Sequence, residues 1–438
     1  MKKKLHFIGI MVAASVLLSI SGCSLNVNDP NAATDQQVLT NPNGIMALAV
    51  GLQQFYSTSA LGMIILTTGL TTRELAANYS QEQLIELDAG GSMLLNNNGN
   101  VTALWSDLYQ VIGMSDNLIS NTTKVSLDPG TRSGILAEAY LFKAMALGNL
   151  AQDFEQAPID VDASGNAKFV PGADVLAEAI SLLDTASQII VATPPSSQFK
   201  SQVLGGGFDL ANTIQAYLAR YDLFAGRYQD AITAANAVNP TATSVFSYSS
   251  LSQNPIYPWV FIRTWYAARD SFGTPLTEPG DQRLSFYLHP DSGAFSMINH
   301  YPIAILAGFF NGLTTPIPAY LPGEMPLIKA EAYVSLGDLA SAVNEINAVR
   351  TEKPSQDPFG IGASLPAYSG PVTTDALLTE IYRQRCAELY LEGMRLEDSR
   401  RLGRPGPPTS TVERNRNYYP YPLQERISNP NTPPDPAD

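Results

Sequence analysis

The sequence predicts a mostly α-helical protein in which helical hairpins form a scaffold that carries an irregular, aromatic-rich lobe. Three observations support this fold class. Apolar residues recur at helical spacing in several long segments. Two segments repeat the same helix–glycine–helix pattern, which is typical of a repeated hairpin. Fourteen aromatic residues crowd into positions 246–310, among prolines and glycines that interrupt long helices and favour loops with short strands.

Residues 1–22 have the pattern of an export signal, with three lysines before an apolar run too short and wrongly flanked for a membrane span. Residues 20–23, Ile-Ser-Gly-Cys, resemble a bacterial lipobox. The resemblance implies cleavage before Cys23 and acylation of that cysteine, which anchors the chain because each buried methylene contributes about 0.8 kcal/mol. An ordinary signal peptide with a chance cysteine is the alternative. Ser24 favours the outer membrane by analogy.

Loss of the three lysines would take the formal charge of the chain from −14 to −17. Nucleic acid repels such a chain, because its binding needs cationic contacts with phosphate. We therefore expect no nucleic-acid partner, and membrane attachment through the N-terminal lipid only. His289 and His300 belong to no metal-binding motif, so no metal and no cofactor are expected. Cys386 would be the only remaining thiol, which excludes an internal disulfide.

Residues 23–43 are polar and are predicted to form a tether, followed by a single domain over 44–438. The helical scaffold is expected at about 44–245 and 322–404. Within it, the apolar periodicity of 101–119 predicts a helix with Trp105 on its buried face. The segment NNNGN just before it predicts a turn, with contact to a polar ligand as the alternative.

The clearest repeat compares residues 216–238 with 330–350. Each has a glycine, Gly226 or Gly337, followed by an alanine five residues later and by Asn-Ala-Val ten residues later. This predicts two antiparallel helices with a turn at the glycine, and the alanine allows them to approach closely. A partial third copy repeats Ala-Glu-Ala-Tyr at 137–140 and 330–333, and its glycine, Gly148, comes about one helical turn later than Gly337 does. The pattern is the signature of tetratricopeptide-like helical hairpins.

The lobe, about residues 246–321, combines aromatic rings with amides and carboxylates, which are the residue types that a glycan-binding surface would need. A pyranose ring has an apolar face of C–H bonds that packs on an aromatic ring, while amides and carboxylates bind its hydroxyls. The candidate platforms are Trp259, Trp265, Tyr266 and Tyr301, and the candidate polar partners are Asn299 and Asp270, with Asn254, Asn311 and Asp281 as further possibilities. The alternative is that the rings form the core of the lobe, because aromatic side chains bury large areas.

A single helix is predicted over residues 375–401, with Cys386 on its apolar stripe as a small buried residue. Arginines and carboxylates alternate along this helix and predict a network of salt bridges rather than a nucleic-acid patch. Nine prolines in residues 405–438 predict an extended or looped tail.

Several segments resemble one known family. The strings ELYLEGMRLEDSRRLGR (388–404), YYPYPLQERISNPN (418–431) and MPLIKAEAYVSLGDLASAVNEINAVR (325–350) are similar to hallmark segments of the SusD/RagB family of outer-membrane nutrient-binding lipoproteins. Segments 137–159 and 105–119 resemble the N-terminal half of the same family. Leu396 and Ser399 depart from the usual pattern, in which an aromatic residue and a leucine stand.

The resemblance implies a non-enzymatic, lipid-anchored protein at the outer membrane, facing the cell surface. It would bind a glycan or another oligomeric nutrient and deliver it to a SusC-like TonB-dependent barrel, with the helices on the barrel and the lobe carrying the ligand. Two alternatives remain: a lipid-anchored helical scaffold for envelope assembly, and a surface glycoside hydrolase. A hydrolase needs two opposed carboxylates, whereas Glu388 and Glu392 are one helical turn apart beside arginines. The sequence leaves open the identity of the ligand, glycan or peptide, and the presence of calcium.

Overall fold

The protein folds as a body of helices with a small sheet at one end. A computed structural model describes residues 39–161 and 164–437; Cys23 and most of the expected tether lie outside these ranges. The helices are α3 (Pro42–Phe55), α4 (Leu61–Thr71), α5 (Glu82–Ala89), α6 (Gly99–Asn121), α7 (Pro129–Asp153), α8 (Gly172–Ala192), α9 (Ser197–Phe199), α10 (Leu210–Phe224), α11 (Tyr228–Ala237), α12 (Gln282–Tyr287), α13 (Glu324–Leu336), α14 (Leu339–Thr351), α15 (Thr374–Glu388), α16 (Arg395–Arg401) and α17 (Leu423–Ser428). The strands are β1 (Leu75–Ala77), β2 (Gln156–Pro158), β3 (Phe169–Pro171), β4 (Val245–Phe246), β5 (Tyr266–Arg269), β6 (Leu288–Phe295), β7 (Pro302–Leu306) and β8 (Ile317–Pro318). The predicted mostly helical fold class is confirmed.

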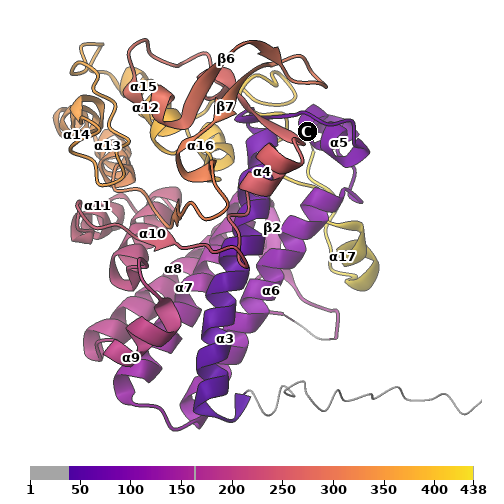
Figure 1. Cartoon of the computed structure of the whole chain (residues 1–438), viewed down its shortest axis with the longest axis vertical. Coiled ribbons are helices and arrows are strands. Elements are labelled where there is room, and N and C mark those ends of the chain that lie inside the picture. Colours follow the sequence, from indigo (N-terminus) through magenta and orange to yellow (C-terminus); the bar gives the residue numbers. More distant parts are fainter. Residues whose placement is uncertain (1–38, 162–163, 438) are drawn as a thin grey trace, which may run out of the picture. The chain divides into compact units, whose positions relative to one another are not determined.

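The centre of the body is α7, which is buried along most of its length between α6 and α8 (Figure 1). Asp128 caps its start by accepting a hydrogen bond from the Thr131 amide at 3.0 Å, and Pro129 occupies the first helical position, where its missing N–H costs nothing. Among the described residues, α8 alone is long and apolar enough to cross a membrane by length and composition. It packs along α7, and its buried residues belong to the core.

The two predicted hairpins are present as α10–α11 and α13–α14. Gly337 ends α13 with a φ of 84°, a left-handed conformation that favours glycine. The Asp338 side chain then caps α14 by accepting from the Ser341 amide at 3.0 Å. Gly226 takes the same role between α10 and α11, with a φ of 71°. Sequence reasoning therefore identified both the hairpins and the residues that turn them.

The predicted turn at Gly148 is wrong, because α7 continues through this residue to Asp153. A β-carbon at position 148 would lie 2.1 Å from the ring of Tyr221 on α10. Glycine is required here for close packing between two helices rather than for a turn. Its resemblance to the turn glycines is a coincidence of spacing.

The lobe contains a four-stranded antiparallel sheet in the order β1-β5-β7-β6. Strand β1 comes from the N-terminal part of the chain and pairs Leu75 with Ala268 and Ala77 with Tyr266. The short strands and loops expected in the lobe are thus present, but one strand is supplied from outside it. This pairing brings the residues that follow β1 beside the predicted aromatic platforms.

The single helix predicted for 375–401 is wrong, because the chain turns between α15 and α16. Leu391 and Gly393 have φ values of 60° and 78°, which helices do not allow. A β-carbon on Gly393 would lie 2.5 Å from Ile64 of α4, so the turn packs directly on the scaffold. Cys386 precedes the turn and is buried as predicted, and burial raises the pKa of its thiol to about 11.

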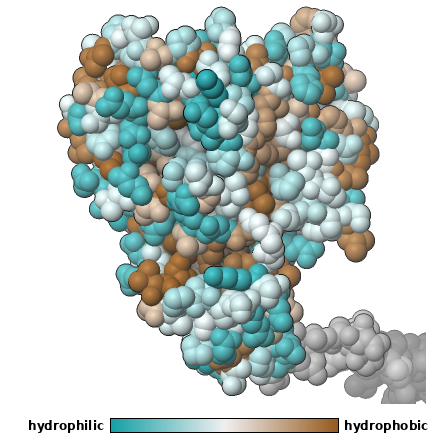
Figure 2. Space-filling view, turned by 60° about the vertical axis from the view of Figure 1, so that its left-hand side comes forward, coloured by the Kyte–Doolittle hydropathy of each residue, from teal (hydrophilic) through white to brown (hydrophobic). Residues whose placement is uncertain are grey.

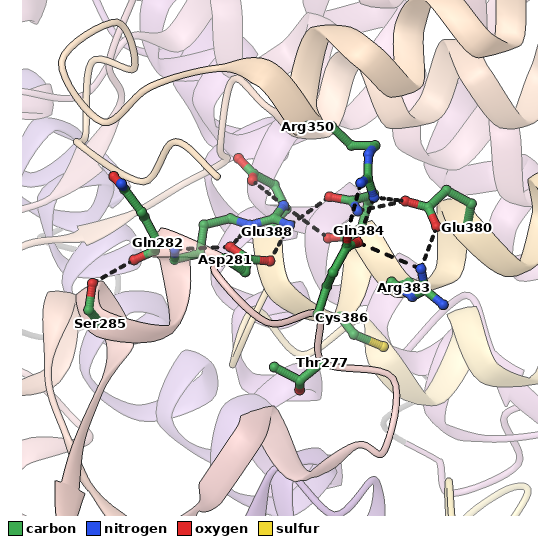
Figure 3. A network of polar contacts seen from close by, with 12 residues as sticks. Thr277, Asp281, Gln282, Ser285, Arg350, Glu380, Arg383, Gln384, Cys386 and Glu388 are labelled. Atoms are coloured by element: carbon green, nitrogen blue, oxygen red, sulfur yellow. Dashed lines mark hydrogen bonds and ion pairs between the residues drawn. The ribbon is translucent and has the colours of Figure 1, made fainter. Parts of the chain in front are cut away.

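A buried polar network attaches the lobe to α15 (Figure 3). Arg283 of α12 is completely buried and donates to Asp281 at 2.6 and 2.9 Å, to Gln384 at 2.6 Å and to Glu388 at 3.0 Å. Burial lowers the pKa of this guanidinium, but the two carboxylates outweigh that effect and raise it above its usual value. The salt-bridge network predicted around the C-terminal helix is confirmed, and Glu388 belongs to it.

The C-terminal tail is mostly extended, as predicted, with one short helix, α17, that was not expected. It packs on the N-terminal scaffold and the loop before β1. The Asn415 side chain donates to the carbonyl groups of Leu87 and Asp88 at 2.8 and 2.9 Å. The hydroxyl of Tyr419 lies 2.8 Å from that of Thr71. The first and last parts of the described chain are therefore bound together.

Candidate ligand-binding site

The candidate site is a loop from Trp259 to Trp265, in which hydrogen bonds between backbone groups hold two indole rings close to each other. The loop begins with a π-helical turn, Pro258–Ile262. The amide of Trp265 donates to the carbonyl of Trp259 at 3.0 Å, and that of Arg263 donates to Pro258 at 2.8 Å. The two indole rings lie 5.1 Å apart at 56°. Two predicted platforms are therefore neighbours on one rigid loop.

Backbone strain accompanies this loop. Thr264, between Arg263 and Trp265, has a φ of 53°, which is rare for a β-branched residue. Ser271 and His300 of the lobe, and Arg73 at its border, are also in the left-handed region. Such strain persists where surrounding contacts impose it, and it concentrates at functional sites.

Tyr79 extends the aromatic surface and was missed by sequence reasoning. Its ring stacks on Trp265 at 5.3 Å and 4°, and 45% of the residue is exposed. The amide of the preceding Asn78 donates to the Trp265 carbonyl at 2.8 Å and fixes the two segments. The pairing of β1 with β5 brings Tyr79 and Trp265 together although they are far apart in the sequence. No local sequence pattern around Tyr79 predicts this contact.

Arg263 was also missed. Its guanidinium lies over the Trp259 ring at 4.5 Å from the centroid and over Trp265 at 5.5 Å, and the residue is exposed. Both contacts are in the range of cation–π attraction. Tyr79, Trp265, Trp259 and Arg263 together are called the aromatic surface below.

Tyr266 was predicted as a platform, but it is only 3% exposed and lies edge-on to Trp259 at 6.3 Å. Its hydroxyl donates to Asn100 at 3.4 Å, and burial raises the pKa of its phenol. The residue supports Trp259 from beneath and offers no face to a ligand.

Tyr301 and Asn299 lie on the connection between β6 and β7, beside the aromatic surface. The Tyr301 ring is half-buried under the Arg269 guanidinium, at 4.0 Å. Asn299 donates to Asp88 at 2.7 Å, and Asp88 also pairs with Arg73 at 3.3 Å. Burial nevertheless raises the pKa of Asp88 above its usual value. These residues form a second polar and aromatic patch.

Asn78 joins the two patches, because its side-chain oxygen accepts from the Met297 amide at 3.0 Å. Asp270 is exposed at the far end of β5 and accepts from the amide of Ser271 at 2.7 Å. Asp281 is committed to Arg283, and Asn254 is fully buried, donating to the Phe309 carbonyl at 2.9 Å. Neither of these last two can reach a ligand, which corrects the expectation for both.

A hollow of about 530 Å³ opens beside Tyr79. It is lined by Ser80, Glu82, Ile85, Glu86, Ser92, Met93 and Leu95. Met93 and Leu95 are more than half exposed there, so the hollow has apolar side chains on its wall. The hollow gives an oligomer room to extend past a single ring.

Other hollows lack a comparable aromatic arrangement. One of about 580 Å³ near α9 is lined by apolar residues that include Leu204, Phe208 and Leu210. Figure 2 shows hydrophobic surface around the narrow waist above the lowest part of the body. Another hollow of about 530 Å³ lies between α11 and the α13–α14 hairpin and contains Lys329 and Glu352. Neither presents stacked rings. No group of three or more potential metal ligands occurs within residues 39–161 and 164–437.

Comparison with known proteins agrees with this fold. Residues 312–435 match the model of the SusD family. A SusD superfamily structure from Bacteroides thetaiotaomicron superposes with a TM-score of 0.70 at 19% identity, covering 90% of this chain and 99% of that one. One from Bacteroides vulgatus gives 0.66 at 16% identity, covering 92% and 98%.

A structure described as a SusD-like carbohydrate binding protein, also from Bacteroides vulgatus, gives a TM-score of 0.67 at 17% identity and covers 89% and 96% of the two chains. No curated protein matches the sequence. At these identities the superpositions establish the fold, while the match over residues 312–435 supplies the family's sequence pattern in the segment that contains the C-terminal hallmark strings. Residues 312–435 thus match the SusD family, and the described chain has the fold of SusD superfamily structures.

Proposed function

We propose that the protein binds a glycan on the aromatic surface and delivers it to a SusC-like TonB-dependent transporter. The observation that carries the proposal is the exposed stack of Tyr79 on Trp265, on a loop fixed by backbone hydrogen bonds. A ring fixed in this way binds the apolar face of a sugar without first losing conformational freedom. Sugar-binding descriptions among structural relatives support the same conclusion for this chain.

The arrangement divides the work between rings. Trp265 has one face covered by Tyr79 and contacts Trp259 and Arg263 on other sides. The outer face of Tyr79 is therefore the accessible platform, and the two indoles set its position. Amide groups nearby, those of Asn78 and Asn299, can accept or donate hydrogen bonds to hydroxyls.

Delivery to a transporter rests on the family and on the lipobox resemblance at Cys23. In this proposal the acylated cysteine holds the protein at the cell surface of the outer membrane, and the helical body packs on the barrel. Purification of the acylated protein from detergent-solubilised outer membranes tests the partnership. A large TonB-dependent barrel recovered in stoichiometric amount supports it, whereas recovery of assembly proteins alone favours the scaffold alternative.

Replacing Tyr79 and Trp265 by alanine tests the binding site. We expect glycan binding to fall at least tenfold, since stacking of a ring on an aromatic side chain contributes about 1 kcal/mol or more, while helix content is retained. Tyr228→Ala on α11 is the control, because this half-buried tyrosine lies on the helical hairpin. Unchanged binding in the double variant would move the site elsewhere. Release of reducing ends by the wild-type protein would support the hydrolase alternative.

A further inference from the structure

Two arginines, one at the end of β5 and one in the loop before it, differ from the other arginines in the described chain. The guanidinium groups of Arg263 and Arg269 form no ion pair or hydrogen bond with any residue that the structure describes, and both contact aromatic rings. The other arginines there are bound to carboxylates, to backbone carbonyls or to side-chain oxygens, as Arg220 is to Glu324 at 2.7 Å. Uncompensated cations beside the aromatic surface need an explanation in a protein with a net charge of −14.

We infer that the ligand is an acidic glycan, whose carboxylate or sulfate group is bound by Arg263 while a sugar ring of the same chain stacks on Tyr79. The inference rests on the proposed function and specifies the class of glycan. Guanidinium groups bind carboxylate and sulfate oxygens through paired, charge-assisted hydrogen bonds. Uronic acids and sulfate esters are the forms in which polysaccharides carry those oxygens.

The geometry at Arg263 suits this role. The guanidinium carbon lies 4.5 Å from the centroid of Trp259 and 5.5 Å from that of Trp265, so cation–π attraction holds the group near both indoles. Its N–H donors have no hydrogen-bond partner among the described residues, so they remain available to a ligand. The side chain is exposed and shares Trp265 with Tyr79. Tyr79 and Arg263 contact the same indole, so a glycan longer than one sugar could stack on Tyr79 and extend to the donors of Arg263.

Arg269 gives the second patch the same character. It lies 4.0 Å above Tyr301, and its Nε is buried without a hydrogen-bond partner among the described residues. Arg73 lies 5.7 Å from the same ring. Burial, together with the charge of Arg73, lowers the pKa of Arg269. Asp88 is the carboxylate paired with Arg73, so this patch has more positive than negative charge.

Carboxylates near the aromatic surface do not neutralise Arg263 and Arg269, but they can influence where an acidic sugar unit binds. Glu82 and Glu86 line the hollow next to Ser80, and Asp270 is exposed directly after Arg269. None of them pairs with Arg263 or Arg269. An acidic sugar unit would be attracted to Arg263 and repelled by the carboxylates of the hollow. This would favour one position of the glycan relative to the site.

The test uses a glycan array that pairs acidic polysaccharides with their neutral counterparts: polygalacturonate with its carboxyl-reduced form, and sulfated galactans with their desulfated forms. The purified protein is compared with Arg263→Gln, and affinities for bound members are then measured by calorimetry. Arg227→Gln is the matched control, since it removes the same charge from a partly exposed arginine in the α10–α11 turn. We expect acidic members to be bound, with affinity reduced at least tenfold by Arg263→Gln and unchanged by Arg227→Gln.

The uronate and sulfate pairs distinguish the two sources of negative charge. Binding of neutral members with equal affinity, unaffected by Arg263→Gln, would overturn the inference and leave the proposed function in place. Absence of binding to every member of the array would overturn the proposed function itself. An equal loss in Arg227→Gln would show general charge attraction and would also overturn the assignment to Arg263. Helix content and thermal melting of each variant confirm that the fold is intact.

Discussion

Arg283 and Arg263 lie in the same lobe, but their guanidinium groups differ in burial and in pairing. Arg283 is fully buried and has a carboxylate, a second carboxylate and an amide as acceptors. Arg263 is exposed, lies over two indoles and has no acidic partner in the described chain. A buried charge is tolerable only when its hydrogen bonds are complete. An exposed charge can remain free, and its freedom is what allows it to bind something else.

Asp153 shows a third treatment. It is buried at the end of α7, and neither carboxylate oxygen has a hydrogen-bond partner among the described residues. Burial raises the pKa of this carboxyl to about 8, although Arg400 lowers it. The residue therefore avoids an unpaired buried charge by keeping its proton. Arg283 is thus paired and Asp153 is neutral, whereas Arg263 in the aromatic surface is charged and has no acidic partner in the described chain.

The largest expected effect is on the buried network. Arg283→Met leaves Asp281 and Glu388 buried without their cation, and we expect the free energy of unfolding to fall by about 3–5 kcal/mol. Urea denaturation followed by circular dichroism measures this. Arg426→Met is the control, because Arg426 pairs with Asp435 near the surface at 2.6 Å and should contribute about 1 kcal/mol or less. Equal losses in the two variants would mean that the buried ion pairs of Arg283 contribute no more to stability than the exposed pair of Arg426.

Asp153→Asn is expected to change the pH dependence of stability. Between its unfolded pKa near 4 and its folded pKa of about 8, the folded state holds a proton that the unfolded state releases, so stability falls as pH rises. The variant should be more stable relative to wild type at pH 8 than at pH 5, by roughly 3–4 kcal/mol. Urea midpoints at the two pH values test this. Asp375→Asn, at an exposed position in α15, should leave the slope unchanged.

Gly148→Ala tests packing rather than charge. The added methyl group would lie 2.1 Å from the Tyr221 ring, and the helices must separate to accept it. We expect a loss of about 1–2 kcal/mol despite the better helix propensity of alanine. In the double variant with Tyr221→Phe the loss should persist, because the ring itself is the obstacle. No loss in thermal stability would show that the interface between α7 and α10 adjusts easily.

The smallest expected effect on stability belongs to Arg263→Gln. Because this side chain is exposed and unpaired, the change in unfolding free energy should be within about 0.5 kcal/mol. Thermal melting in the absence of glycan measures it. A large loss would mean that Arg263 supports the loop structurally, and any loss of binding could then no longer be assigned to a missing ligand contact.

Sequence reasoning succeeded where the determinant was local. Gly226 and Gly337 announce their turns because left-handed backbone favours glycine, and Cys386 follows from an apolar stripe. It failed where a distant contact decides. Gly148 looks like a turn residue until Tyr221 is placed against it, and the turn after Glu388 packs on Ile64, which is distant in the sequence.

The aromatic site was predicted in part for the same reason. The crowding of aromatics identified Trp259 and Trp265, which the structure brings together, but it could not separate them from the buried Tyr266. Tyr79 enters only through the register of β1 on β5. Arg263 carries no motif, because what distinguishes it is the absence of a partner within the described chain, and that is visible only in three dimensions.

The pairing of β1 with β5 also affects when the candidate site can form during folding. Tyr79 is synthesised early, but its supporting ring arrives with Trp265, and Asp88, which holds Asn299, is fixed in turn by Asn415 near the end of the chain. Contacts between such distant segments form late in folding, because closing long loops is entropically slow. A chain cut short before residue 415 would lack the hydrogen bonds of Asn415 that hold Leu87 and Asp88, and Asn299 would then lose a fixed partner.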